Sequence, residues 1–322
     1  MFRLFIFFLF PVSLFSQGTD SIPLSIAHPL LRSFEIAYEN DLLTVPINGR
    51  TDYYYTGGSF IGFNLPALQK NPVSKVLVKL PNGYDESFGI TISNLGFSPT
   101  SIKSDSILYG DRPFCGTLFL GLNRVSCNNV KRIRLSSKLD LGVIGPSALG
   151  YETQKFIHAH TNNPEPHGWQ FQIANDVYVN YSLKLEKGLL AKKNAIELIG
   201  YGIANAGTIY TNAGMGLLLR TGRMDDYFTS RRASDRLQAW AYFSGEAKVI
   251  GHDATLQGGL FDNKSVYVIP PSDVRRAVFS TSAGIVLAYK KVRVEWFNTF
   301  LTPEFRDGKS HGWGHLGLEF FF

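Results

Sequence analysis

The carboxy-terminal segment is the feature that most constrains the fold of this chain. Residues 312–322 read GWGHLGLEFFF, alternate apolar positions with small or polar ones, and end on Phe322. Soluble proteins rarely end this way, because an unpaired apolar strand edge in water invites aggregation. In lipid, the final strand of a barrel pairs with the first so that no backbone group is left unpaired. The ending therefore predicts a closed β-barrel that spans a bacterial outer membrane.

The amino-terminal segment is typical of a secretory signal. A charged start at Arg3 is followed by an apolar run over residues 4–15 and then by small and polar residues. The alternative, a helical membrane anchor, needs about 20 apolar residues, and Pro11 interrupts this run. We expect residues 1–16 to be a signal peptide and residues 17–322 to form one barrel domain. No later stretch is long and apolar enough to predict a transmembrane helix.

Composition agrees with strands whose two faces meet lipid and water. Aromatic residues make up 14% of the chain, charged residues only 18%, and mean hydropathy is near zero. The formal net charge of +6 favours an anionic lipid surface or reflects ordinary loop lysines. Nucleic acid is not an expected partner, because the basic residues are scattered and follow no known binding motif. Cys115 and Cys127 bracket an extended segment of roughly 40 Å, so we expect no disulfide between them.

Period-two patterns predict an all-β fold, a transmembrane antiparallel up-and-down barrel of about twelve strands. Charged and aliphatic residues alternate most clearly over 33–41, 132–144 and 177–186, which indicates a polar lumen and an apolar exterior. Side chains can fill a barrel of this size, so a wide pore is not implied. The weaker runs, separated by Gly, Asn, Asp and Pro turns, are 56–65, 86–97, 113–125, 193–204, 208–221, 237–250, 275–289, 291–301 and 312–322.

One stretch follows a helical pattern instead. Residues 147–160 place Tyr151, Gln154 and His158 at i, i+3 and i+7, on one face of a short helix. Ser147 is the candidate N-cap. We expect this helix to lie over or inside the mouth of the barrel, near the end that carries the functional site.

Polar side chains gather where the first strands end. The first strand ends at Asn40-Asp41 and the second begins near Thr56, so the loop between them brings these side chains together. His158 is the candidate proton acceptor, and Glu165 follows it in the next loop. This set suits ester hydrolysis, with His158 activating water and a calcium ion on Asp41 and Glu165 polarising the ester carbonyl. The alternative interpretation is that these are turn residues and a structural histidine.

The motifs at these positions resemble the lipid A 3'-O-deacylase family of outer-membrane enzymes. Each motif is weak alone, but the series keeps the family order from the first strand to the sixth. The carboxy-terminal half matches only in its barrel pattern. The matching pieces are END at 39–41, TDY at 51–53, YTGG at 55–58, GDRPF at 110–114, GVIGPSA at 142–148, QKFIH at 154–158 and GWQFQ at 168–172.

The resemblance implies a calcium-dependent enzyme that removes the 3'-linked acyloxyacyl chain of lipid A at the outer-leaflet end of a twelve-stranded barrel. Its partners are then lipopolysaccharide of the outer leaflet and, through the last strand, the barrel-assembly machinery. Asp41 is the first choice for a metal ligand. By position the catalytic set comprises His158 as the water-activating base, Gln154 as its polar neighbour, and Asn40, Asp41, Thr56 and Gly57 at the strand ends.

The sequence departs from the family pattern at one position. Pro164 stands where the family has an acidic residue, and Glu165 follows one step later. Either Glu165 binds the metal in place of that acidic residue, or the metal site is altered. The Asp111-Arg112-Pro113 turn is interpreted as a structural corner with an internal ion pair rather than a headgroup contact. The remaining histidines named here are expected in loops or in the lumen: His160, His167, His311 and His315.

Two other functions fit the same barrel. A serine-type outer-membrane phospholipase needs a serine beside a histidine on a lipid-facing strand, and no sequence pairing indicates one. A non-catalytic porin or adhesin would scatter Asp41 and His158 around a polar lumen. The deacylase hypothesis instead predicts that His158, Asp41 and Thr56 converge at one barrel end that opens toward lipid, with His158 within one water molecule of Asp41.

Overall fold

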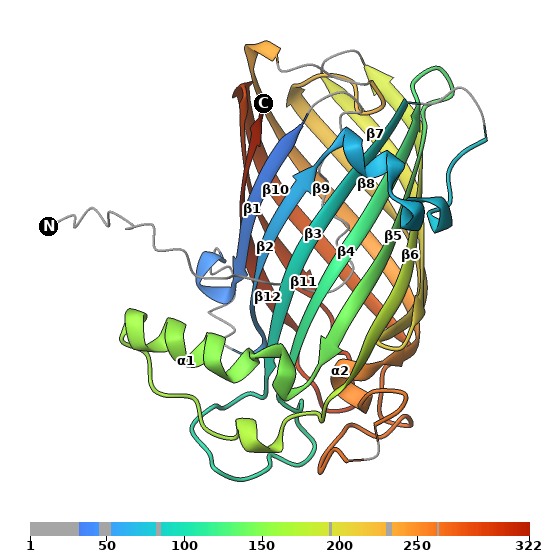
Figure 1. The fold of residues 1–322 in the computed structure, drawn as a ribbon. Helices are drawn as coiled ribbons and strands as arrows, with labels where there is room; N and C mark the ends of the chain where they lie inside the picture. The colour runs from blue at the N-terminus through green and yellow to red at the C-terminus, as the bar shows by residue number, and fades with distance from the viewer. Residues whose placement is uncertain (1–31, 45–52, 82–84, 193–194, 230–233, 263) are drawn as a thin grey trace, which may run out of the picture.

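The computed structural model describes residues 32–44, 53–81, 85–192, 195–229, 234–262 and 264–322. The predicted signal peptide, residues 1–16, lies outside the described residues. The described chain forms a closed antiparallel barrel in which each strand pairs with its neighbours in sequence and β1 pairs with β12 (Figure 1). The strands are β1 (Ser33–Asn40), β2 (Tyr54–Asn64), β3 (Asp85–Ser98), β4 (Cys115–Asn128), β5 (Ile133–Ile144), β6 (Asp176–Lys192), β7 (Ile196–Gly207), β8 (Tyr210–Arg223), β9 (Ser234–Asp253), β10 (Ala277–Lys290), β11 (Val292–Leu301) and β12 (His311–Phe321).

The predicted barrel of twelve strands is therefore confirmed. The helical elements lie in the connections between strands. In the part of the chain that the structure describes, no helix is long and apolar enough to cross a membrane. These elements are η1 (Asp41–Leu43), η2 (Pro66–Lys70), η3 (Pro72–Val76), η4 (Pro146–Ala148), α1 (Gly150–Thr161), η5 (Trp169–Phe171) and α2 (Ala254–Gln257).

The two ends of the barrel differ in the length of their connections. The loops after β3, β5 and β9 leave one end and include residues 99–114, 145–175 and 254–276. At the opposite end, β4 joins β5 through residues 129–132, and β10 joins β11 through Lys291 alone. In barrels of the outer membrane, long loops face the exterior and short turns face the periplasm. We call these ends extracellular and periplasmic; α1 lies at the extracellular end (Figure 1).

The lumen is filled by charged side chains that pair with one another. Lys138 and Asp140 approach to 2.9 Å, and Arg220 and Glu197 to 2.6 Å, with all four side chains buried. The apolar side chains that alternate with them, such as Leu141, are exposed on the outer wall. The polar lumen and apolar exterior predicted from the alternation are confirmed, and Cys115 and Cys127 are both free, as expected.

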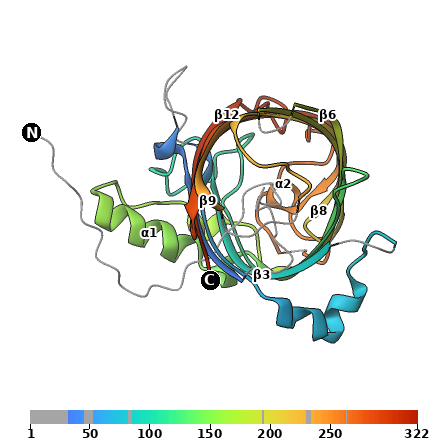
Figure 2. The same ribbon diagram turned by 90° about the horizontal axis from the view of Figure 1, so that it is seen from above.

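Helix α1 differs in placement from the sequence expectation. It packs against β3 and β4 and lies beside the extracellular rim, outside the wall, rather than over or inside the mouth (Figure 2). Its first residue, Gly150, touches Gly116 of β4 so closely that a Cβ on Gly116 would lie 3.1 Å from the Gly150 nitrogen. Ser147 is not the N-cap, because it belongs to η4 and Leu149 occupies the cap position with a φ of 59°.

The Asp111-Arg112-Pro113 turn is a structural corner, as predicted. The Arg112 side chain is 1% exposed and donates to Glu304 at 2.5 Å and to Thr255 at 2.6 Å. Asp111 accepts hydrogen bonds from the backbone and hydroxyl of Thr100. These contacts tie three extracellular loops together inside the barrel, so Arg112 has no surface left for a lipid headgroup.

Candidate active site

The strand-end residues of β1 and β2 meet as the shared loop predicts. The Asn40 amide donates to the Thr56 carbonyl at 2.6 Å, and its oxygen accepts from the Leu42 backbone at 2.9 Å, which caps η1. Asn40 and Asp41 are both buried. The Thr56 hydroxyl lies 2.5 Å from that of Ser98 on β3. One amide thus fixes the two strand ends against each other and places Asp41 at the start of η1.

Gly57 allows the close approach of these two strand ends. The pairing of β2 with β3 shifts by one residue between Tyr55 and Gly57, which is a β-bulge. Gly57 has a φ of +154°, and a Cβ there would lie 2.9 Å from the Glu39 carbonyl and 3.3 Å from the Asn40 amide nitrogen. A side chain at Gly57 would therefore push Asn40 away from Thr56.

We expect Gly57→Ala to reduce activity about 100-fold without unfolding the barrel, because displacement of a reacting group by about 1 Å costs that much. The matched control is Gly96→Ala, since Gly96 is the register partner of Gly57 and a Cβ there meets atoms only at 3.9 Å. Initial rates on purified lipid A, the substrate that the sequence resemblance implies, measure the effect. Equal activity in the two variants would show that the close approach at Gly57 is not required.

The predicted face of α1 contacts the loop that follows the helix. The Tyr151 hydroxyl lies 3.3 Å from the Glu165 carboxylate, and Gln154, which is buried, accepts from the indole nitrogen of Trp169 at 2.6 Å. The Nδ1 atom of His158 lies 2.6 Å from the Pro164 carbonyl oxygen. The side chains at positions i, i+3 and i+7 of α1 therefore hold residues 164–169 against the helix.

The contact of His158 with Pro164 determines which ring nitrogen can act as a base. A carbonyl oxygen only accepts hydrogen bonds, so Nδ1 of the neutral imidazole must carry the proton. The lone pair is then on Nε2, the nitrogen that points away from this contact. Pro164, which departs from the family pattern in the sequence, thus orients His158 through its backbone carbonyl.

Glu165 is engaged on the outer surface of α1. Its carboxylate lies 2.5 Å from the Lys155 ammonium group, and the side chain is 54% exposed. The hydrogen bond from Lys155 lowers the pKa of Glu165, and the same contact raises the pKa of Lys155. This pairing competes with the expected role of Glu165 as a metal ligand.

The donors at the strand ends fit calcium only in part. Among the described residues, no group of three His, Cys, Asp or Glu side chains is arranged to hold a metal ion. Calcium is also bound by backbone and amide oxygens. Asp41 provides a buried carboxylate next in sequence to Asn40, whose amide bonds the carbonyl of Thr56, and this suits such a site, whereas Glu165 is paired with Lys155.

β3 connects the helix to the strand-end residues. Asn94 and Gly96 are two residues apart, so both point to the same face of this strand. Asn94 donates to the Ala148 carbonyl at the base of α1, while Gly96 pairs with Gly57. Asn94 also pairs with Leu118 on the lipid-facing side of β4, so this shared face is the outer wall. Helix α1 and η1 both project from this side of the barrel (Figures 1 and 2).

A buried hydrogen-bond network behind the site was not predicted from the sequence. The carboxylate of Glu39 accepts from the Tyr55 hydroxyl at 2.7 Å and lies 2.9 Å from Nδ1 of His315. The pairing of β1 with β12 sets Glu39 directly opposite His315, 276 residues away in sequence. The aromatic carboxy-terminal strand was the available signal, because it predicts that β12 closes on β1. His315 lies in the lumen, one of the two locations expected for it.

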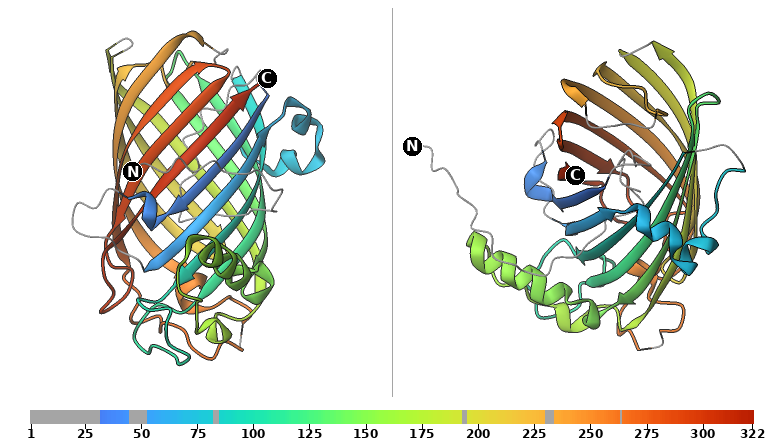
Figure 3. Two further views of the ribbon diagram at one scale, coloured as in Figure 1. Left: turned by 90° about the vertical axis from the view of Figure 1, so that its left-hand side faces the viewer. Right: turned by 45° about the horizontal axis from the view of Figure 1, so that its top comes forward.

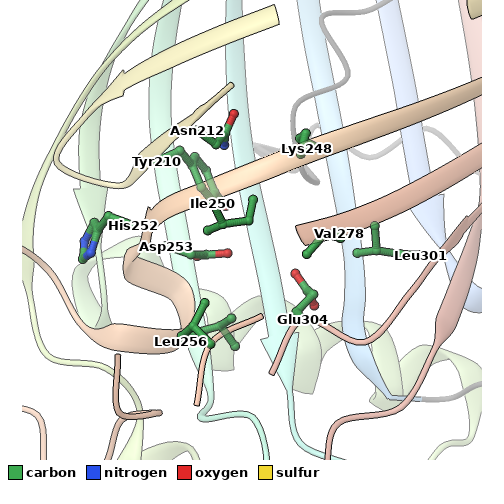
Figure 4. A pocket seen from close by; sticks show the side chains of 11 residues that line it. Tyr210, Asn212, Lys248, Ile250, His252, Asp253, Leu256, Val278, Leu301 and Glu304 are labelled. Carbon is green, nitrogen blue, oxygen red and sulfur yellow. The ribbon is translucent and has the colours of Figure 1, made fainter. Parts of the chain in front are cut away.

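A pocket with a mixed polar and apolar lining lies inside the barrel mouth beside α2 and is separate from this site (Figure 4). None of the sequence-predicted site residues lines it. Glu304, which lines it, is paired with Arg112, and Lys248 lies 3.3 Å from Glu246. Viewed along the barrel, α2 lies within the wall and α1 outside it (Figure 2). The lining residues are Tyr210, Asn212, Lys248, Ile250, His252, Asp253, Leu256, Val274, Val278, Leu301 and Glu304.

Comparison with solved structures identifies the barrel type. LpxR from Salmonella typhimurium matches with a TM-score of 0.70 at 21% identity, covering 90% of this chain and 100% of that chain. The β-domain of the Bordetella autotransporter BrkA matches with a TM-score of 0.39 at 10% identity, covering 90% and 97%. Pseudomonas putida OprB matches with a TM-score of 0.36 at 8% identity, covering 96% and 99%. No curated protein matches the sequence.

The sequence match extends over nearly the whole chain. Residues 4–322 match the family described as outer membrane protein LpxR. The resemblance inferred from the ordered motifs is thereby confirmed, and the family match with the shared barrel supports a lipid A deacylase of the outer membrane. The chain belongs to the LpxR family and is an integral β-barrel of the outer membrane.

Proposed function

We propose that this protein hydrolyses the ester that links the 3' acyloxyacyl chain to lipid A, with His158 as the general base. The observation that carries the proposal is the Pro164 contact, which leaves Nε2 of His158 with its lone pair beside a lipid-facing wall. The buried Asn40 and Asp41 and the half-buried Thr56 and Gly57 supply polar groups on the same side of the barrel. The approach of His158 to Asp41 within one water molecule remains a prediction.

The reaction follows from the protonation state of His158. Nε2 takes a proton from a water molecule, and the water oxygen attacks the ester carbonyl carbon to give a tetrahedral oxyanion. The second amide hydrogen of Asn40, which the Thr56 carbonyl does not use, is a donor for this oxyanion. The imidazolium then returns its proton to the sugar oxygen as the carbon–oxygen bond breaks. The products are the free acyloxyacyl acid, with its internal ester intact, and the lipid A hydroxyl.

Calcium is proposed as the cofactor, which Asp41 and oxygens of the strand ends would hold. When bound there, it supplies positive charge that stabilises the oxyanion. The ionic pairing of Glu165 with Lys155 leaves Asp41 as the protein carboxylate assigned to this role.

Access from the membrane is supported by apolar side chains around the site. Leu42 in η1 and Phe156 in α1 are exposed on the outer side of the barrel, and so is Leu149 before the helix. Such side chains favour contact with acyl chains rather than water. A porin would place its functional groups in the lumen, where the charged residues are instead paired with each other.

The test is expression in a host that makes a single lipid A species and has no deacylase of its own. Mass spectrometry of the retained lipid A should show the loss of one acyloxyacyl group, with the released fatty acids recovered in the same sample. An empty plasmid is the control. Fatty acids released from phospholipid with intact lipid A would indicate a phospholipase, and unchanged lipids would indicate a non-catalytic barrel.

A further inference from the structure

Residues 65–81, which we call the strap, follow β2 along the outside of the barrel at its periplasmic end (Figures 2 and 3). The strap contains the two short helical turns η2 and η3, and each begins with a proline, at Pro66 and Pro72. Its residues are drawn in cyan and teal, well away from α1 and from the site described above (Figure 3). The other connections at this end range from the single residue 291 to the ten residues 224–233 between β8 and β9, so the segment between β2 and β3 that contains the strap is the longest of them.

The strap is bonded to the outer wall across several strands. The guanidinium group of Arg124 on β4 donates to the Leu77 carbonyl at 3.1 Å, and the Ser137 hydroxyl on β5 donates to the Val78 carbonyl at 2.8 Å. The Tyr181 hydroxyl on β6 accepts from the Val78 backbone at 2.8 Å. Leu77 is 2% exposed. These contacts fix the strap at one height on the wall.

At that height polar side chains first enter the outer surface of β4 and β5. The outward rows of β3 to β6 follow from the strand register, because they alternate with the paired charges of the lumen. Polar side chains are avoided where a barrel faces hydrocarbon, and tyrosines concentrate at the membrane interface. The row on the extracellular side of the strap is Ile90, Leu122, Leu139 and Tyr181; the next row, beneath the strap, is Phe88, Arg124, Ser137 and Leu183.

The free surface of the strap combines apolar and cationic side chains. Val73, Val76 and Val78 are 41%, 56% and 48% exposed. The strap also carries exposed lysines and contains no Asp or Glu. Exposed apolar side chains beside lysines are typical of segments that lie in the interface of an anionic membrane. The lysines are Lys70, Lys75 and Lys79, of which Lys79 also lies 3.5 Å from Glu86 on β3.

We propose that the strap binds anionic phospholipids of the periplasmic leaflet. Its valines enter the boundary between headgroups and acyl chains, and its lysines contact lipid phosphate groups. A lipid is assigned rather than a soluble protein because the strap lies on the wall at the level of Tyr181, where Arg124 and Ser137 follow the apolar outer rows of β4 and β5. The covered Arg124, bonded to the strap and to Glu86 at 2.7 Å, is thereby kept out of the hydrocarbon.

Lipid titration of the folded protein in neutral detergent tests the cationic part. Phosphatidylglycerol should bind more tightly than phosphatidylcholine and less tightly as salt rises. The strap variant Lys70→Gln/Lys75→Gln/Lys79→Gln should bind phosphatidylglycerol at least about tenfold more weakly. The control variant Lys131→Gln/Lys192→Gln/Lys291→Gln, which neutralises the same number of exposed lysines at the periplasmic end, should bind as the parent does. Equal losses in both variants, or none in the strap variant, would overturn the proposal.

A tryptophan at Val76 tests the apolar part. In vesicles that contain phosphatidylglycerol brominated near the headgroup, Val76→Trp should show extra fluorescence that bromine quenches, relative to the parent with its four tryptophans. Heat-dependent mobility on gels checks that each variant is folded. If the added fluorescence has the emission wavelength of a tryptophan in water and bromine does not quench it, the strap lies outside the membrane. That result would indicate a soluble partner and overturn the lipid assignment.

Discussion

Replacing His158 with alanine is expected to lower the rate of lipid A deacylation by about 10²- to 10⁴-fold, the usual contribution of a positioned general base. The side chain lies on α1 beside the barrel, and its described hydrogen bond is to the Pro164 carbonyl. The strands keep their pairing and their lumen ion pairs in the variant, so assembly should be unchanged. Mass spectrometry of lipid A and heat-dependent gel mobility measure the two outcomes separately.

His160→Ala is the matched control for this variant. His160 lies on the same helix, and its Nδ1 also bonds to a backbone carbonyl, that of Phe156, at 2.8 Å. Loss of this imidazole changes the charge and helix content as much as loss of His158 does. We expect the His160 variant to retain nearly the parent rate. Equal activity in the His158 variant and the parent would remove His158 from the mechanism.

The strands could be predicted from the sequence because residues that face lipid are apolar, residues that face the lumen are polar, and the two kinds alternate along each strand. β5 was expected over 132–144 and spans Ile133–Ile144. The strands that extend furthest beyond their predicted ranges are β6 and β9, which reach Lys192 and Asp253. Where a strand extends beyond the membrane, neither of its faces contacts lipid. The alternation of apolar and polar residues therefore ends before the hydrogen-bonded pairing of the strands does.

The site was predictable where its contacts are local. Asn40 and Thr56 lie across one loop, and antiparallel pairing alone brings them together. The contact of Glu39 with His315 depends on the register that closes the barrel, which no local pattern encodes. The direction of α1 depends on the close packing of Gly150 on Gly116 and on the positive φ of Leu149, and neither feature has a sequence signature of its own.

Asp41→Asn is expected to lower activity by about 10³-fold at calcium concentrations that saturate the parent, because loss of a metal that stabilises an oxyanion costs several kcal/mol. Asparagine keeps the shape of the side chain but removes its charge, and calcium prefers carboxylate ligands. In the parent, chelation should abolish activity and added calcium should restore it. Titration of activity against free calcium measures both effects.

Two comparisons separate a metal role from a general loss of charge. Asp273→Asn removes another carboxylate at the extracellular end, one that pairs with Arg306 at 3.3 Å, and should leave the calcium response unchanged. Lys155→Gln frees Glu165 from its ion pair, so if Glu165 can join Asp41 at the metal, this variant should need less calcium than the parent. An unchanged calcium requirement would assign the metal to Asp41 without Glu165. Full parental activity after exhaustive calcium removal would instead refute the metal role of Asp41 and leave His158 to act with the amide donors of the strand ends.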